Sequence, residues 1–246
     1  SFLLMGPDIN EDYVRQVINL TQTTSGSYLL MSSLDISRRN LALHGQEIFD
    51  KVTEMVEYAR KEINQIGDYY AYSRELVNGD SVYDFDVTKL SVNTLAVGLA
   101  GIEVYDLLRD EYDIQTEFGD IGNILAYVSV GDRPRDIERL VSALAEIRRL
   151  YKKDRAGLLS GEYIAPKVIR SPQEAFYAEK KSLQIRETSG CISGEFVMCY
   201  PPGIPILAPG EMITDEIIEY IIYAKEKGCS MQGTEDPAVE HLMVLV

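Results

Sequence analysis

The sequence predicts a mixed α/β and α+β fold, and three observations lead to that expectation. First, 246 residues with 46% hydrophobic content are enough to bury a substantial core. Second, strand-like and helix-like segments alternate between residues 89 and 151, which is typical of helices packed on one face of a small sheet. Third, capping signals and proline-rich or glycine-rich breaks mark the ends of several segments.

The first part of the chain is predicted to be mostly helical. Phe2–Met5 is a short apolar run before Gly6-Pro7 and is expected to be a buried strand. A helix is expected to open near Asn10. A long helix is then expected over residues 29–66, because apolar residues recur there at helical steps and predict a core stripe: Leu41, Ile48, Val52, Met55, Ala59, Ile63 and Ile66. The opposite face carries cations: Arg38, Arg39, Lys51, Arg60 and Lys61.

The middle of the chain reads as strand, helix, strand, strand, helix. Strands are expected at residues 89–94, 114–118 and 124–130. A helix is expected at residues 101–112, and another begins near Asp132, with a proline in its first turn, and runs to Tyr151. Asp84 and Asp86 flank Phe85, but no third ligand follows at loop spacing, so no metal site is expected.

The last part of the chain is predicted to be a third α+β unit, reached through a charged linker at residues 152–170. Ser171-Pro172-Gln173-Glu174 has the spacing of a capping box that opens a helix. Strands are expected at residues 183–185, 190–199 and 240–246. A helix capped by Thr214 is expected to end near Lys225 and Gly228.

A proline-rich stretch, residues 200–211, is expected to organise this last unit. Its sequence is Tyr200-Pro-Pro-Gly-Ile-Pro-Ile-Leu-Ala-Pro-Gly-Glu211. Three prolines in five residues exclude a helix, and Gly203 and Gly210 permit positive φ at two corners. A rigid, buried loop of this kind could present Glu211 to a cation. The alternative is a proline-rich corner that only closes a small domain.

A second polar motif lies at residues 21–28, where six of eight residues carry a hydroxyl group. Hydroxyl and free N–H groups directly before a helix can donate hydrogen bonds to an anion. The alternative is an ordinary helix N-cap.

Composition excludes several classes of partner. The net charge of −15 argues against nucleic acid as a ligand. Three cysteines without paired spacing (Cys191, Cys199 and Cys229) indicate reduced thiols in a cytoplasmic protein. The two histidines, His44 and His241, do not have zinc-ligand spacing, and no apolar run is long enough to span a membrane.

Two ordered blocks resemble one family, the ornithine/lysine/arginine decarboxylases that depend on pyridoxal 5'-phosphate (PLP). Residues 21–35 resemble the family's Thr-Thr-Ser-Pro-Ser-Tyr segment and the Ala-Ser-Leu-Asp that follows it. Residues 172–211, with Glu174-Ala-Phe-Tyr177, Ile192-Ser-Gly-Glu195 and the Tyr-Pro-Pro-Gly loop, resemble its C-terminal domain. Gln232-Gly233 extends the likeness, which is greatest to the short bacterial arginine or lysine decarboxylase type.

The resemblance implies an aspartate-aminotransferase-like (fold type I) enzyme. Residues 1–35 would be the end of the PLP-binding large domain, 36–155 a small α+β domain and 156–246 a C-terminal decarboxylase domain. The family's PLP lysine follows a histidine, and no lysine in this chain does so. The chain therefore resembles the C-terminal half of the enzyme, beginning just after that lysine, and alone it is expected to be inactive, with no catalytic residue of its own.

The resemblance also assigns roles to four residues. Thr23 and Ser25 would reach across a dimer to the partner's PLP phosphate, while Glu211 would hold the distal cationic group of the substrate and Tyr200 would shape the pocket. Two departures weaken the match locally. Gly26 replaces a usual proline, and Cys191 replaces a common arginine.

Two hypotheses follow from these patterns. In the first, the chain is the C-terminal portion of a decarboxylase that acts on arginine, lysine or ornithine, works with an N-terminal half and forms a homo-oligomer. In the second, it is a catalytically silent binding or assembly subunit of such an enzyme. The sequence does not choose among the three substrates.

Overall fold

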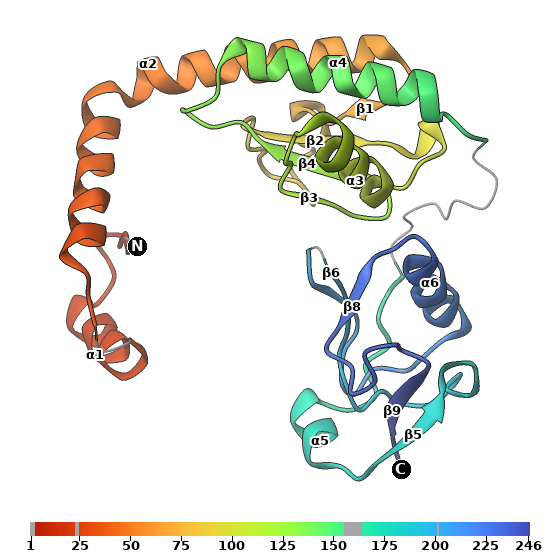
Figure 1. Cartoon of the computed structure of the whole chain (residues 1–246). Coiled ribbons are helices and arrows are strands. Elements are labelled where there is room, and N and C mark those ends of the chain that lie inside the picture. Colours follow the sequence, from red (N-terminus) through yellow and green to blue (C-terminus); the bar gives the residue numbers. More distant parts are fainter. Residues whose placement is uncertain (1–2, 23–24, 155–163, 201) are drawn as a thin grey trace. The chain divides into compact units, whose positions relative to one another are not determined.

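The computed structural model describes residues 3–22, 25–154, 164–200 and 202–246 (Figure 1). The chain divides into two compact units, Ser1–Lys51 and Val52–Val246. They are called the first and second unit below. The second unit holds all three buried clusters of the described residues, so it is the part of the chain with a hydrophobic core.

The first unit is helical, as predicted. Helix α1 (Glu11–Thr21) is capped by Asn10, whose side chain accepts a hydrogen bond of 3.0 Å from the Tyr13 N–H. The prediction of a buried strand at residues 2–5 is wrong for the described residues 3–5. They form no strand, and Leu4 is 91% exposed. A strand needs a hydrogen-bonded neighbour, and no described residue pairs with this segment.

Helix α2 (Tyr28–Ile66) confirms the long helix, but its apolar stripe is buried only in part. From Val52 onward the stripe enters the core of the second unit, whereas Leu41 is 43% exposed. The placement of Arg60 on the polar face is wrong, because its side chain is only 4% exposed. Its guanidinium donates to backbone carbonyls of Tyr72, Val87 and Lys89, and these contacts explain its burial.

The second unit begins with a four-stranded antiparallel sheet in the order β1-β2-β4-β3. Its strands are β1 (Tyr70–Ala71), β2 (Lys89–Asn93), β3 (Phe118–Gly119) and β4 (Asn123–Tyr127). The strands expected at 89–94 and 124–130 are confirmed within a few residues. The strand expected at 114–118 is wrong for most of its length, because the Ile114 N–H still bonds the Leu108 carbonyl at the end of the preceding helix.

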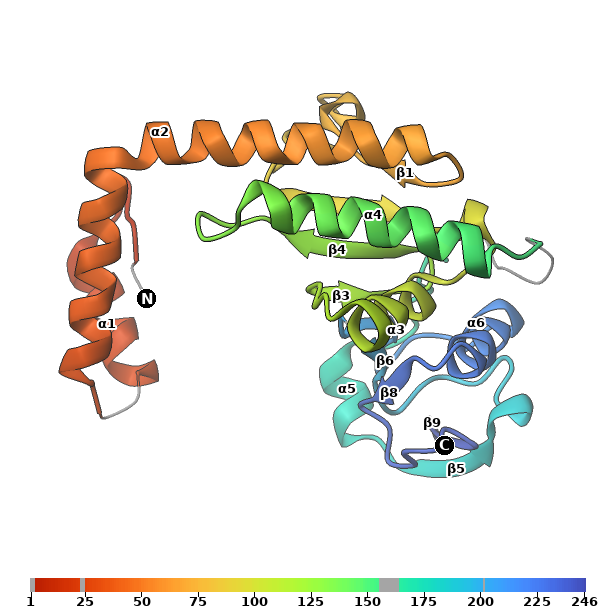
Figure 2. The same ribbon diagram turned by 45° about the horizontal axis from the view of Figure 1, so that its top comes forward.

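Three helices cover one face of this sheet, as the element order predicted. Helix α3 (Gly101–Tyr112), helix α4 (Pro134–Tyr151) and the second half of α2 share one buried cluster with Leu90, Val92 and Ile124. The two views agree that α4 runs beside this part of α2 (Figures 1 and 2). The alternating side chains of β2 and β4 on the other face are more polar and include Ser91, Asn93 and Asn123.

The rest of the second unit is also α+β. The capping box at Ser171 and Glu174 is confirmed and opens helix α5 (Pro172–Tyr177). Strand β5 (Lys180–Gln184) pairs with β9 (His241–Leu245), and a three-stranded sheet follows the order β7-β6-β8. Its strands are β6 (Val197–Tyr200), β7 (Ile204–Leu207) and β8 (Ser230–Gln232). Helix α6 (Asp215–Glu226) is capped by Thr214, as predicted.

Strand lengths in this part differ from the prediction. The strand expected at 190–199 is regular only from Val197, and Ile192 and Ser193 make isolated bridges to different segments. Ile185 begins a short 3-10 helix, η3 (Ile185–Glu187), rather than continuing β5. Two more 3-10 helices precede them, η1 (Arg74–Leu76) and η2 (Leu95–Val97).

The two parts of the second unit are joined by a small buried cluster and by ion pairs. Ala100, Ile102 and Ile121 pack with residues of the C-terminal part: Cys199, Tyr223, Ala224 and Cys229. The carboxylate of Glu103 lies 3.4 Å from the Lys153 ammonium and 3.5 Å from that of Lys227. Residues before and after the 155–163 segment therefore share one packed unit.

Candidate functional site

The hydroxyl-rich segment lies directly before α2, where the sequence placed it. Thr23 lies outside the described residues. Ser25 is exposed, and its hydroxyl makes no hydrogen bond to another described residue. Helix α2 begins at Tyr28, and the Met31 N–H bonds the Ser27 carbonyl at 3.0 Å. The Ser25 hydroxyl is therefore accessible to a ligand or to a partner.

The proline-rich stretch forms the β6–β7 hairpin and the turn that follows it. Gly203 and Gly210 adopt φ values of 88° and 92°, which confirms their predicted positive φ. The expected burial is wrong for the hairpin tip, since Ile204 is 70% exposed while Leu207 is fully buried. Strand β7 lies at the edge of its sheet, a position that tolerates Pro205 although proline has no N–H to donate to a neighbouring strand.

Glu211 has a defined place in the turn after β7. One carboxylate oxygen, Oε2, accepts a hydrogen bond of 2.8 Å from the Ala208 N–H. The backbone carbonyl of Glu211 accepts from the Ser193 N–H at 2.8 Å, and Glu211 also bridges to Val168. The side chain is half-buried. These contacts fix the carboxylate and close the corner at the same time.

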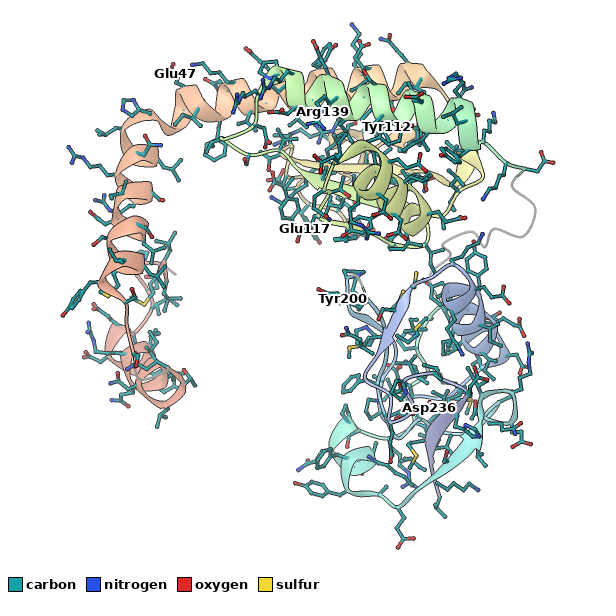
Figure 3. All side chains as sticks on the ribbon, in the orientation of Figure 1. Glu47, Tyr112, Glu117, Arg139, Tyr200 and Asp236 are labelled. Atoms are coloured by element: carbon teal, nitrogen blue, oxygen red, sulfur yellow. The ribbon has the colours of Figure 1, made fainter. Side chains whose placement is uncertain are left out.

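Tyr200 ends strand β6, and its side chain is 49% exposed near the tip of the hairpin (Figure 3). It lies at the opposite end of the hairpin segment from Glu211, and no described hydrogen bond joins the two side chains. The structure therefore places Tyr200 and Glu211 on one element without bringing their polar atoms together. Ser25 belongs to the first unit.

A cavity of about 570 Å³ lies in the second unit, and the sequence alone did not indicate it. Its polar lining comes from the open face of the four-stranded sheet and from α6: Tyr72, Asn93, Asp120, Asn123 and Tyr220. The hairpin supplies four apolar lining residues, Pro202, Ile204, Pro205 and Ile206. Alternation in β2 and β4 was the available signal, because it places Asn93 and Asn123 side by side in the register.

The polar groups of this cavity are held by short local contacts. Asp120 Oδ1 accepts from the N–H groups of Gly122 (2.8 Å) and Asn123 (2.6 Å). The Asn123 Oδ1 accepts from the Tyr72 hydroxyl and from Asn93 Nδ2, both at 3.2 Å. Burial, with smaller contributions from neighbouring acidic groups, raises the pKa of Tyr220 to about 12, so its phenol is neutral at pH 7.

The cysteines are free thiols. Cys199 and Cys229 are buried together, and Cys191 is half-buried. The hydrogen bond with Cys199, together with burial, raises the pKa of the Cys229 thiol. A protonated, buried thiol is a poor nucleophile.

Two features are absent from the described part of the chain. It contains no group of three or more His, Cys, Asp or Glu side chains that could hold a metal ion. None of its helices combines the length and the apolar character needed to cross a membrane.

Comparison with known proteins shows which family and which solved structures this chain is similar to. Residues 161–236 match the family described as the Orn/Lys/Arg decarboxylase C-terminal domain. The constitutive lysine decarboxylase of E. coli has the same fold over 97% of this chain and 46% of its own, with a TM-score of 0.70 and 17% identity. The lysine decarboxylase of Francisella novicida covers the same shares, with a TM-score of 0.72 and 18% identity. The chain therefore resembles the Orn/Lys/Arg decarboxylase family over nearly its whole length.

Among curated relatives, the chain is similar to arginine decarboxylases. It is 36% identical over 240 residues to that of Bacillus subtilis (strain 168), covering 96% of this chain and 49% of the relative. It is 37% identical over 235 residues to that of Halalkalibacterium halodurans, covering 94% and 48%. The chain thus spans about half the length of the curated relatives it matches. The family resemblance and the mixed α/β fold with antiparallel sheets are confirmed.

Proposed function

We propose that this chain is the C-terminal portion of a PLP-dependent decarboxylase that removes the α-carboxylate of a basic amino acid as CO₂. Its similarity to proteins named arginine decarboxylase supports arginine as the substrate to test first. The observation that carries the proposal is the contrast between the two units. The second unit has its own core, whereas the first exposes the apolar surface that a further part of an enzyme would cover.

The exposed surface of the first unit is extensive. Helix α1, all of whose residues are described, contains no buried residue. Large apolar side chains of α1 and of the start of α2 are open to solvent, among them Leu20 (86% exposed), Leu29 (84%) and Leu30 (68%). Many exposed large apolar side chains in one segment are typical of a surface that a partner covers. In the proposal, residues 1–35 complete a fold type I large domain, 36–155 form the small domain and 156–246 the C-terminal domain.

In this proposal, the chain's own residues bind and orient the cofactor and the substrate. PLP, when bound, supplies the electron sink that decarboxylation needs. The Thr23 and Ser25 hydroxyls would donate to its phosphate across a subunit boundary, and the accessible Ser25 hydroxyl suits that role. The Glu211 oxygen that is not bonded to Ala208 would meet the distal cation of the substrate, and Tyr200 would line the approach.

The reacting centre would come from an N-terminal half, within a cytoplasmic homo-oligomer. In this family the PLP lysine follows a histidine, and no lysine of these 246 residues does so. This chain alone is therefore proposed to be inactive. It would position cofactor and substrate for a lysine that another segment provides.

Co-expression with the N-terminal half of a related arginine decarboxylase tests the proposal. We expect a stable complex that releases CO₂ from arginine, while this chain alone releases none. Changing Thr23 to Val together with Ser25 to Ala should weaken PLP binding about ten-fold or more, since a hydrogen bond to a charged group contributes about 1.5–3 kcal/mol. Ser32→Ala on exposed α2 is the matched control and should leave PLP binding unchanged.

Three other outcomes would count against parts of this proposal. Turnover by the isolated chain would overturn the dependence on an external lysine. A stable complex without turnover of arginine, lysine or ornithine would favour a silent assembly subunit. Failure to form any complex with either half-enzyme or intact relatives would remove both readings of the exposed first unit.

A further inference from the structure

We propose that the cavity between the open face of the four-stranded sheet and the β6–β7 hairpin binds a small organic cation, an amine or guanidinium with a short apolar stem. The inference rests on the lining of the cavity and stands independently of the decarboxylase proposal. The volume of about 570 Å³ falls in the range typical of small-molecule sites, roughly 300–1,000 Å³.

The charge of the cavity has one sign. Among the described residues that line it, Asp120 is the only aspartate or glutamate, and no lysine, arginine or histidine is present. The nearby ammonium groups of Lys153 and Lys227 are paired with Glu103, which does not line the cavity. A carboxylate in a partly enclosed site, without a local counter-ion, favours cations and repels anions.

The carboxylate of Asp120 is held in place with one oxygen left available. Its Oδ1 accepts the Gly122 and Asn123 N–H groups, so the side chain cannot turn away without breaking the turn before β4. Its Oδ2, among the described residues, accepts only a long hydrogen bond of 3.4 Å from Asn123 Nδ2. A bound N–H donor would complete the hydrogen bonding of this oxygen.

Neutral polar groups surround the carboxylate and would orient a ligand. Asn123 Oδ1 gathers the Tyr72 hydroxyl and Asn93 Nδ2, which fixes all three side chains on the sheet face. Because the Tyr220 phenol is neutral at pH 7, its oxygen can accept a hydrogen bond from a cationic donor. Several donors, as on a guanidinium, would match these acceptors better than a single hydroxyl.

The apolar lining accounts for the stem. Ile121 and Leu95 lie on the sheet side, and Ile164, Pro205 and Ile206 come from the C-terminal part. Three or four methylene groups would lie along these side chains and be removed from water, which favours binding. Because both parts of the second unit line the site, a ligand would tie them together and raise the melting temperature by mass action.

Titration calorimetry on the 246-residue chain, with butylguanidinium as the probe, tests this site. We expect one site per chain, and binding at least about ten-fold weaker for the neutral isostere butylurea, because a charged donor gains more from a carboxylate. Asp120→Asn keeps the Oδ1 acceptor and removes the charge, so it should weaken butylguanidinium about ten-fold or more. Glu117→Gln is the matched control and should change nothing, since this exposed side chain is not among the residues that line the cavity.

A variant with increased affinity tests the site without relying on a loss of binding, which misfolding could also cause. Asn93→Asp keeps the Oδ1 that accepts the Leu95 N–H and adds a second negative charge to the lining. It should tighten butylguanidinium and leave butylurea unchanged. The proposal is overturned if butylguanidinium does not bind at up to about 10 mM, which corresponds to less than about 3 kcal/mol. Equal binding of the urea, or equal binding by Asp120→Asn and Glu117→Gln, would overturn it too.

Discussion

Replacing Arg60 with methionine is expected to destabilise the second unit by about 3–5 kcal/mol. The Arg60 side chain is 4% exposed, yet it carries a full charge, because burial lowers the pKa of its guanidinium without bringing it near neutrality. Its Nε donates to the Tyr72 carbonyl at 2.8 Å. Its Nη2 donates to the carbonyls of Val87 at 2.6 Å and Lys89 at 3.1 Å.

The magnitude follows from what methionine would leave behind. Three backbone carbonyls would lose their partner, at a cost of about 1–3 kcal/mol for each one that stays buried. The Phe85 ring, 5.4 Å from the guanidinium carbon, would lose a cation–π contact of about 0.5–1 kcal/mol. Removing the desolvation cost of the charge offsets part of this sum, and the methionine stem keeps the apolar packing. A net loss near 3–5 kcal/mol remains.

Urea denaturation followed by far-ultraviolet circular dichroism measures the loss. The matched control is Lys61→Met, an exposed neighbour on the same helix, which should lie within about 0.5 kcal/mol of the parent chain. Arg60→Lys retains the charge but not the fork geometry, so it should fall between the two. If Arg60→Met costs less than about 1 kcal/mol, the three carbonyls must find water or other donors. The stabilising role assigned to the Arg60 hydrogen bonds would then be refuted.

The remaining predictions concern a glycine, a carboxylate and the thiols. Gly101→Ala should lower the free energy of unfolding by about 3 kcal/mol, because the added Cβ would lie 2.0 Å from the Asn123 carbonyl oxygen. The control Gly45→Ala, whose added Cβ has its nearest atom at 3.9 Å, should be neutral or stabilising in the same urea titration. Asp236 accepts the N–H groups of Ala238, His241 and Glu240, and these hydrogen bonds hold its pKa below the usual range. A carboxylate whose pKa is lower in the folded state stabilises the fold above its unfolded pKa of ~3.9, and this stability is lost as the pH falls through the folded pKa. Asp236→Asn should therefore make the free energy of unfolding less dependent on pH in the acid range. An unchanged pH dependence would refute the stabilising role of these three hydrogen bonds. In the native chain a thiol reagent should label Cys191 first and reach Cys199 and Cys229 only on unfolding, and rapid labelling of all three would contradict their burial.

Elements with local signals were predicted well from the sequence. Helix α3 begins and ends at the predicted residues, and the Ser171 and Thr214 caps are present, because helix periodicity and capping depend on residues within one or two turns. Strands depend on partners far along the chain, so the predicted strand at 190–199 is broken into isolated bridges and then β6.

Arg60 and the cavity show what pattern reasoning could not supply. A helical stripe assigns Arg60 to the solvent side, but the carbonyls that bury it belong to residues 72–89, which only the tertiary fold brings near. Likewise Asp120 and Tyr220 are a hundred residues apart in the sequence, and no motif links them before the sheet and α6 are in place. Polar residues on the open face of a half-covered sheet were the one available hint.

Glu211 illustrates how a structural and a functional assignment can share one side chain. The sequence posed them as alternatives: a carboxylate presented to a cation, or a proline-rich corner closing a domain. The Ala208 N–H occupies one oxygen, so the corner is real. That same hydrogen bond restricts the rotation of the carboxylate, and a carboxylate has about four acceptor positions. The contact that closes the turn therefore also holds the second oxygen in a fixed place, which is the property a cation-binding group requires.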